Sequence, residues 1–308
     1  MTEIKFGLEG VADVFVGKAD KDGNLIPKTL EHRAYARNVI TSTGLDDLGA
    51  GRGSGWGYFV AVGSGTGTPA QADLSLFNYV ATSVAGTSVA GVISGGSPWY
   101  MEDRRRFEFG AGAAAGNLTE LGLVAVGGSA DKIQSHALFT DISGSPTTVV
   151  VLADDILVIH YYVRVYVLET DTTYNTTVNG VTTAFNMRSQ LTEAFTLFTS
   201  SGSAFQMYSS FVYSGGQLNG IGVQPSGTLL NEFEPVYGVP TDYTPGSYYR
   251  ETAYSYPLSR ANGVWTSVLI RTQGGYRAKF GISPAFTKTA SNTVNWTVRV
   301  AWANYVPA

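Results

Sequence analysis

The chain has 308 residues, enough for two domains of ordinary size, because single hydrophobic cores stop growing at roughly 250 to 300 residues. It carries 24 acidic and 20 basic residues, and this net charge of −4 argues against a basic surface that binds nucleic acid. Cysteine is absent, which excludes disulfides, thiolate metal sites and cysteine nucleophiles and fits synthesis in a reducing cytoplasm.

The composition is typical of strands and turns. There are 37 glycines, 11 prolines and many threonine, valine and tyrosine residues. We therefore predict an all-β fold, mainly antiparallel, of β-sandwich-like domains with at most one or two short helices. Only 14% of the residues are charged, against roughly 25% in an average soluble domain, which suggests that partners cover much of the surface.

The first 30 residues predict an N-terminal β-hairpin or arm, with short strands at 4–10 and 11–17 and a turn at Asp22-Gly23-Asn24. The opening lacks a basic start followed by an apolar run, so no signal peptide is expected. No stretch approaches roughly 18 uninterrupted apolar residues, so membrane insertion is not expected either.

Ser42 or Thr43 is placed to cap one short helix.

Residues 31–170 predict a β-rich domain, with short strands separated by glycine-rich turns. Its last strand, 156–168, alternates with period two. One face is predicted to be core and consists of Leu157, Ile159, Tyr161, Val163, Val165 and Val167. The other face is predicted to be a surface or interface and carries His160, Tyr162, Arg164 and Tyr166.

Residues 171–308 predict a second β-sandwich-like domain, with the boundary between Glu169 and Tyr174. Asn179-Gly180 is typical of a type I′ hairpin. Near the end, one face of an amphipathic strand carries Val294, Trp296, Val298, Val300 and Trp302.

Two groups of residues are candidate binding surfaces. In a strand, Arg104 and Arg106 share one face and Arg105 the other, which suggests a row of salt bridges between subunits. A proline- and glycine-containing stretch gathers tyrosines, which supply large contact area at low entropy cost. It is interpreted either as a protein or sugar interface or as a loop folded on its own domain, and it contains Tyr237, Tyr243, Tyr248, Tyr249, Tyr254 and Tyr256.

A weak calcium candidate lies near the start of the chain. Asp20, Asp22 and Asn24, with Glu31 eleven residues after Asp20, mimic the ligand spacing of an EF-hand loop. The sixth position, which requires glycine, is Leu25, and the flanks do not look helical. An exposed turn is therefore the favoured interpretation, and no cofactor is predicted.

The sequence contains few residues in patterns that are typical of catalytic sites. The three histidines, His32, His136 and His160, lie in separate predicted elements, and no Gly-x-Ser-x-Gly motif accompanies them. The acidic pairs at 46–47 and 154–155 lie in turn or helix-start contexts that favour aspartate for capping. The glycine-rich stretch 63–67 has no following helix that would make it a phosphate loop. We therefore predict that the protein is not an enzyme.

The stretch 107–126 begins with Phe107 and Phe109, continues through Gly116-Asn117 and ends with Glu120 to Leu123. It is followed by Leu138-Phe139, Gly144 to Pro146 and Asp154-Asp155 before the long strand. Together with ARNVITSTGLDDL and AVGSGTGTPAQADLSL upstream, this pattern resembles virion proteins of tailed bacteriophages described as tail, fibre or appendage components. The resemblance covers roughly residues 31 to 167.

The resemblance implies a non-enzymatic structural subunit that is assembled in the bacterial cytoplasm and located in the virion. Its expected partners are copies of itself and other virion proteins, in the tail, fibre base, collar or a sleeve. A receptor-binding module that contacts a host surface glycan or protein, and a capsid decoration protein, are the alternatives. An enzyme acting on cell-envelope polysaccharide would need two positioned carboxylates, which the pattern does not supply.

Overall fold

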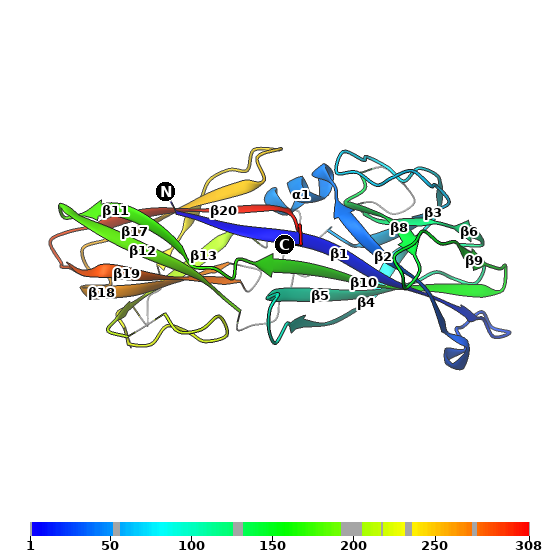
Figure 1. Ribbon diagram of the computed structural model, residues 1–308, viewed down its shortest axis with the longest axis horizontal. Helices are drawn as coiled ribbons and strands as arrows, with labels where there is room; N and C mark the ends of the chain where they lie inside the picture. Colours follow the sequence, from blue (N-terminus) through cyan, green and yellow to red (C-terminus); the bar gives the residue numbers. More distant parts are fainter. Residues whose placement is uncertain are drawn as a thin grey trace.

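The computed structural model describes residues 2–51, 56–125, 132–191, 205–216, 218–231, 236–272 and 276–307. Within these ranges the fold is all-β, as the composition predicts, with one α-helix, α1 (Ser42–Gly49), and one 3-10 turn, η1 (Pro27–Thr29). No helix in the described ranges is long and apolar enough to cross a membrane. Figure 1 shows two β-units arranged end to end along the longest axis.

The first unit is a closed barrel in the part of the chain that the structure describes, where a β-sandwich-like domain was expected. Eight strands follow one another around it, and the pairing of β1 with β10 closes the circle. A separate two-stranded sheet pairs β6 (Gly116–Leu118) with β9 (Val149–Val151). In order around the barrel, the strands are β10 (Asp155–Val167), β5 (Tyr100–Glu108), β4 (Tyr79–Ile93), β3 (Phe59–Gly63), β7 (Glu120–Val124), β8 (Ser135–Thr140), β2 (Glu31–Ile40) and β1 (Thr2–Lys18).

The second unit is a β-sandwich. One sheet extends from the start of β1 through β20 (Val294–Asn304), β17 (Tyr249–Tyr256) and β16 (Val239–Pro240). The other sheet is made of β11 (Thr172–Val178), β12 (Val181–Gln190), β19 (Arg277–Lys288), β18 (Gly263–Thr272), β13 (Met207–Ser214) and β14 (Thr228–Leu229), with β15 (Val236–Tyr237) paired to β13. Aromatic rings fill the space between the sheets, and the ring centroids of Phe280 and Trp296 lie 4.8 Å apart.

Strand β1 belongs to both units. Instead of two short strands in a separate hairpin or arm, residues 2–18 form one strand of 17 residues through the middle of the molecule. Its start pairs in parallel with β20, and its remainder pairs antiparallel with β2 and β10. Gly10 is not a turn residue here: a Cβ at this position would lie 2.2 Å from the buried hydroxyl of Tyr161. The glycine is needed because a side chain from β10 fills its space.

Several local predictions are confirmed. The core face of β10 is buried, from Leu157 to Val167, and so are Val298, Val300 and Trp302 on β20. Asn179 and Gly180 have φ values of 51° and 80° and join Val178 to Val181, as a two-residue hairpin turn requires. Helix α1 lies where it was expected, but its cap is Thr41, whose side chain accepts a hydrogen bond from the Gly44 N–H.

Contacts at the end of β20 join the two units. The indole N–H of Trp302 donates to the Leu45 carbonyl on α1 at 3.0 Å, and the Tyr243 hydroxyl donates to Asp46 at 2.6 Å. The Asn304 side chain accepts from the Ile40 N–H and donates to the Ile40 carbonyl. These bonds tie α1 and the last residue of β2 to the sandwich, so the units share a packed junction.

Candidate functional site

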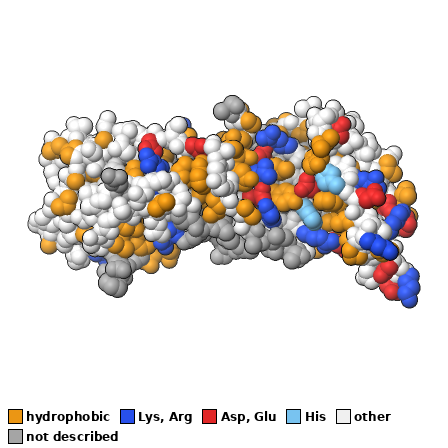
Figure 2. Space-filling model, turned by 60° about the horizontal axis from the view of Figure 1, so that its bottom comes forward, with side chains coloured by type: hydrophobic (Ala, Val, Ile, Leu, Met, Phe, Trp, Pro, Cys, Tyr) orange, Lys and Arg blue, Asp and Glu red, His pale blue; other side chains and the backbone are white. Residues whose placement is uncertain are grey.

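Five of the predicted interface residues come together on the outer face of the barrel. Strands β5, β10, β1 and β2 are neighbours there, and their outward side chains form cross-strand rows that we call the ladder face. Figure 2 shows basic, acidic and histidine side chains beside hydrophobic ones over the barrel half of the molecule. The ladder face consists of Tyr100, Glu102, Arg104, Arg106, Glu108, His160, Tyr162, Arg164, Tyr166, Glu9, Asp13, Tyr35 and Arg37.

The register of the strands sets which side chains meet. Arg104 lies opposite Tyr162, and Arg106 lies opposite His160. Arg164 lies between Glu102 on β5 and Glu9 on β1. Because directly opposed residues on one sheet face have Cβ atoms about 4.5–5.5 Å apart, these pairs are in contact range by backbone geometry alone.

Two of the four carboxylates of the ladder face, Glu102 and Glu9, are buried beside the guanidinium groups. Glu102 is 2% exposed and accepts from Arg104 at 2.6 Å and from Arg164 at 2.7 Å. Glu9 is 5% exposed and accepts from Arg37 and from the Tyr166 hydroxyl. Each acid is thus compensated by two donors, and the surface presents arginine and tyrosine groups whose positions are already fixed.

Aromatic rings of the ladder face pack against two of its arginines. The Arg104 guanidinium lies 5.5 Å from the Tyr162 ring centroid, and that of Arg164 lies 5.0 Å from the Tyr100 centroid, both within cation–π range. Burial, the Asp13 charge and the hydrogen bond to Asp13 raise the pKa of Tyr162 to about 12. Burial, followed by the Arg106 charge, lowers the pKa of His160. Tyr162 therefore stays protonated, and His160 is neutral at pH 7.

The ladder face carries no net charge when histidine is neutral, because four carboxylates balance four guanidinium groups. Arg106 pairs with Glu108, just as the other three arginines pair with Glu9 or Glu102. A surface that binds a phosphate backbone needs uncompensated cations. All four guanidinium groups of the ladder face are thus compensated by carboxylates.

The tyrosine stretch does not form one surface. Tyr237 is 54% exposed, and Tyr243, Tyr248 and Tyr249 are half-buried. The interface prediction is wrong for Tyr254 and Tyr256, which are buried. They lie on β17 and point inward between exposed neighbours, so they are core side chains of a strand and not tips of a loop.

The calcium candidate is a turn in the structure. The Asp20 carboxylate accepts the backbone N–H groups of Asp22 and Asn24, both at 2.9 Å, and these bonds lower its pKa. Glu31 pairs instead with Arg33 at 2.6 Å. Among the described residues, no group of three or more histidine, cysteine, aspartate or glutamate side chains is placed to hold a metal ion.

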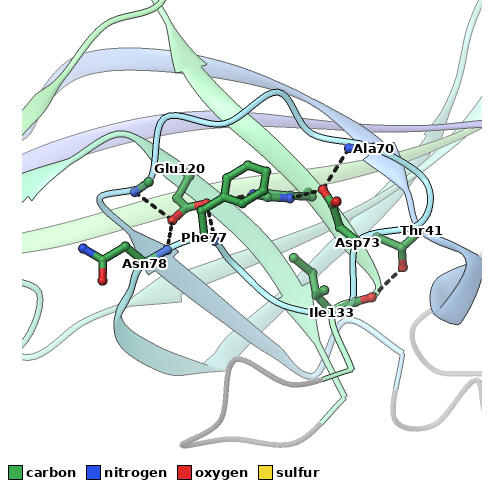
Figure 3. Close-up of polar contacts among 9 residues, drawn as sticks. Thr41, Ala70, Asp73, Phe77, Asn78, Glu120 and Ile133 are labelled. Atoms are coloured by element: carbon green, nitrogen blue, oxygen red, sulfur yellow. Dashed lines mark hydrogen bonds and ion pairs between the residues drawn. The ribbon is translucent and has the colours of Figure 1, made fainter.

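The barrel unit also contains a buried acid–histidine–acid cluster that the sequence analysis did not predict. His136 is fully buried, with Nδ1 2.6 Å from Asp73 and Nε2 2.8 Å from Glu120. Glu120 also accepts the backbone N–H groups of Gly65, Phe77 and Asn78 at 2.8, 3.0 and 2.8 Å (Figure 3). The cluster holds the loop 64–78, which joins β3 to β4, against β7 and β8.

This cluster explains part of the sequence pattern on which the phage resemblance depends. Glu120 and the glycine-rich stretch were both part of that pattern, and a Cβ on Gly65 would lie 2.5 Å from the Glu120 carboxylate. The glycine allows the backbone to approach the acid closely. The pairing of His136 was not predicted because Asp73 and Glu120 are 63 and 16 residues away from it along the chain. The His136 ring is fully buried and links the loop 64–78 to β7.

Acid is expected to remove the stabilisation that Glu120 provides. Burial raises its pKa, but the hydrogen bonds from His136 and three backbone N–H groups outweigh burial and hold the pKa below the ordinary value of 4.5. Because the folded-state pKa is depressed, the contribution is complete above pH 4.5 and is lost as pH falls through the lower value. Urea unfolding of the native protein and Glu120→Gln should show a stability difference that shrinks below pH 4.5; a constant difference would contradict this assignment.

No protein-family model, no curated protein and no solved structure matches this chain. The function proposed below is therefore built on the sequence and on the geometry of the ladder face.

Proposed function

We propose that the protein is a non-enzymatic structural subunit of a tailed bacteriophage particle, associated with the tail, and that it assembles through the ladder face. The observation that carries the assembly part is the fixed, charge-balanced array of arginine and tyrosine side chains. The phage part is supported by the resemblance over residues 31 to 167, and the low charge of the whole chain supports a surface covered by partners.

Arginine and tyrosine are enriched among residues that contribute most to protein–protein binding. Association usually costs roughly 0.5–1.5 kcal/mol for each flexible side chain that becomes ordered. On the ladder face Arg104 and Arg164 are already held by Glu102, and Tyr162 donates to Asp13 at 3.0 Å. Much of this ordering cost is therefore met in the free protein. A neutral face also permits contact with a second copy of itself, because like charges need not oppose each other.

The self-association of the purified protein tests the assembly. Sedimentation equilibrium should show a mass above that of one chain, and the double variant Arg104→Ala/Tyr162→Ala should weaken association about tenfold or more, as expected for loss of central contacts. Glu102 keeps Arg164 as a partner in this variant, so the barrel should still fold. Circular dichroism checks this.

The matched control removes one basic and one tyrosine side chain outside the ladder face. Lys21 lies in the exposed turn, and Tyr58 is 45% exposed and outside the ladder face, so Lys21→Ala/Tyr58→Ala should associate like the native protein. Mass spectrometry of purified phage particles would locate the chain and give its copy number. A stable monomer at high concentration, together with absence from particles, would refute the proposed function.

A further inference from the structure

A groove opens into the sandwich at the end distant from the barrel. It lies between β11 and the start of β20, has a volume of about 760 Å³, and reaches the aromatic rings between the sheets. Figure 1 shows β11 and β20 at this end of the molecule, close to the N-terminus. The groove is lined by residues 173–178 of β11, residues 294–297 of β20 and the aromatic side chains of Phe185, Trp265 and Phe286.

One wall of the groove is a free strand edge. Residues 294–297 of β20 pair with β17 on one side. The other side of β20 is taken by β1 only from Val298 onward, opposite Thr2, and within the described part of the chain no strand pairs with 294–297 there. This free edge of β20 is about 13 Å long at the usual strand rise, and alternate residues along it present their main-chain N–H and C=O groups to the groove. An extended segment seated there would lie in line with β1.

In the part of the chain that the structure describes, the inner face of the other sheet is incompletely covered at this end. On β11, Tyr174 and Val178 point inward and pack partly against the core. Thr176 lies between them on the same face of the strand, yet it is exposed. Trp296 and Val294 on β20 are also inward residues that remain half-buried. An inward position is exposed in a sandwich when the opposite sheet has no strand to cover it.

The side chains that line the groove indicate which kind of ligand it can bind. Threonine, asparagine and aromatic side chains predominate, and the charge of Glu251 is paired with Arg299 at 2.6 Å. Exposed strand edges in soluble proteins are usually protected by lysine, proline or a bulge. Residues 173–178 and 294–297 contain neither lysine nor proline. The edge is thus open to pairing, and an uncharged strand would enter without burying an unpaired charge.

We propose that this groove is a docking site for an extended, uncharged segment of another polypeptide chain, which adds to the sheet as a strand beside β20. Its main chain would pair with Val294–Thr297, and every second side chain would cover Trp296 and Tyr174. This is strand addition, in which main-chain hydrogen bonds supply affinity and alternate side chains supply specificity. The inference does not depend on the ladder face.

The experiment supplies a strand at high local concentration. The probe is an extension of six alternating threonine and valine residues, fused directly before the first residue of the full chain. Hydrogen exchange should slow at least about tenfold at those amides of Val294–Thr297 that face the groove, relative to the protein that carries an extension of six glycine and serine residues. Thr176→Lys in the fused protein should abolish the difference because it places a charge over the groove.

Thr182→Lys is the matched control. Thr182 is exposed on the neighbouring strand and does not line the groove, so the protection should survive this change. Equal exchange with both extensions would overturn the proposal. A sugar ligand would be indicated by a second result. In that case maltohexaose or cellohexaose, both neutral oligosaccharides, would quench tryptophan fluorescence in the native protein but not in Thr176→Lys, and the threonine–valine extension would give no protection. This combination would also overturn the proposal. Because neither readout requires self-association, failure here is distinguishable from failure of the proposed assembly.

Discussion

Glu120→Ala is expected to lower the free energy of unfolding by about 3–5 kcal/mol, the usual cost of removing one partner from a buried charged network. The change removes four hydrogen bonds and leaves three backbone N–H groups and the His136 ring without their acceptor. Urea unfolding followed by far-UV circular dichroism measures the loss. The loop 64–78 should also become the first site of limited proteolysis, because its anchor is gone.

Asp141→Ala is the matched control for this substitution. Asp141 also accepts backbone N–H groups, from Ser143 and Ser145, but it lies in an exposed turn. Water can replace these bonds, so the expected loss is below about 1 kcal/mol. If both variants lost the same stability, the burial of the Glu120 cluster would not explain its effect.

Trp302→Ala should cost about 3–5 kcal/mol, the range for truncating a buried tryptophan. Trp302 is 2% exposed, and its ring stacks with those of Phe205 and Tyr243 at centroid distances of 5.4 and 5.8 Å. The variant also loses the hydrogen bond to Leu45 on α1, so it opens a cavity at the junction of barrel and sandwich. The measurement is urea unfolding, with tryptophan fluorescence as a second probe.

Trp296→Ala makes the same chemical change on the same face of β20. Trp296 is half-buried beside the open groove, so less contact is lost and water can occupy the space. We expect roughly half the cost of Trp302→Ala, since the cost depends on the cavity left behind. Equal losses at both positions would contradict the assignment of the larger cost to the burial of Trp302 at the junction.

Elements with strong local signals were predictable from the sequence. The period-two alternation of β10 and β20 and the Asn179-Gly180 turn depend only on neighbouring residues, and the structure confirms them. The closure of the barrel was not predictable, because it depends on the register between β1 and β10, whose residues are about 150 positions apart. The expected division of residues 4–17 into two short strands was wrong for the same reason: the Tyr161 hydroxyl that fills the space at Gly10 comes from β10.

The candidate site was likewise predictable only where the signal is local. The alternation of arginine and tyrosine placed Arg104, Arg106, Tyr162, Arg164 and Tyr166 on outward faces, but only the strand order makes these faces adjacent. Tyr254 and Tyr256 were misplaced because nearby proline and glycine residues suggested a loop, although their spacing by two already fitted a strand. The partners of Glu120 in the loop 64–78 are all backbone N–H groups, which residue types alone do not identify.

The sharing of β1 between both units also constrains the order in which the molecule can form. Thr2 pairs with Val298, so two strands from opposite ends of the sequence must meet in parallel. At about 5–20 residues per second, roughly 15–60 s separate their synthesis on the ribosome. The barrel strands all emerge earlier and can close first, whereas the start of β1 must wait, with its hydrogen-bonding groups unpaired, until β20 emerges. Completion of the sandwich is therefore a late, non-local step, the kind that slows folding most.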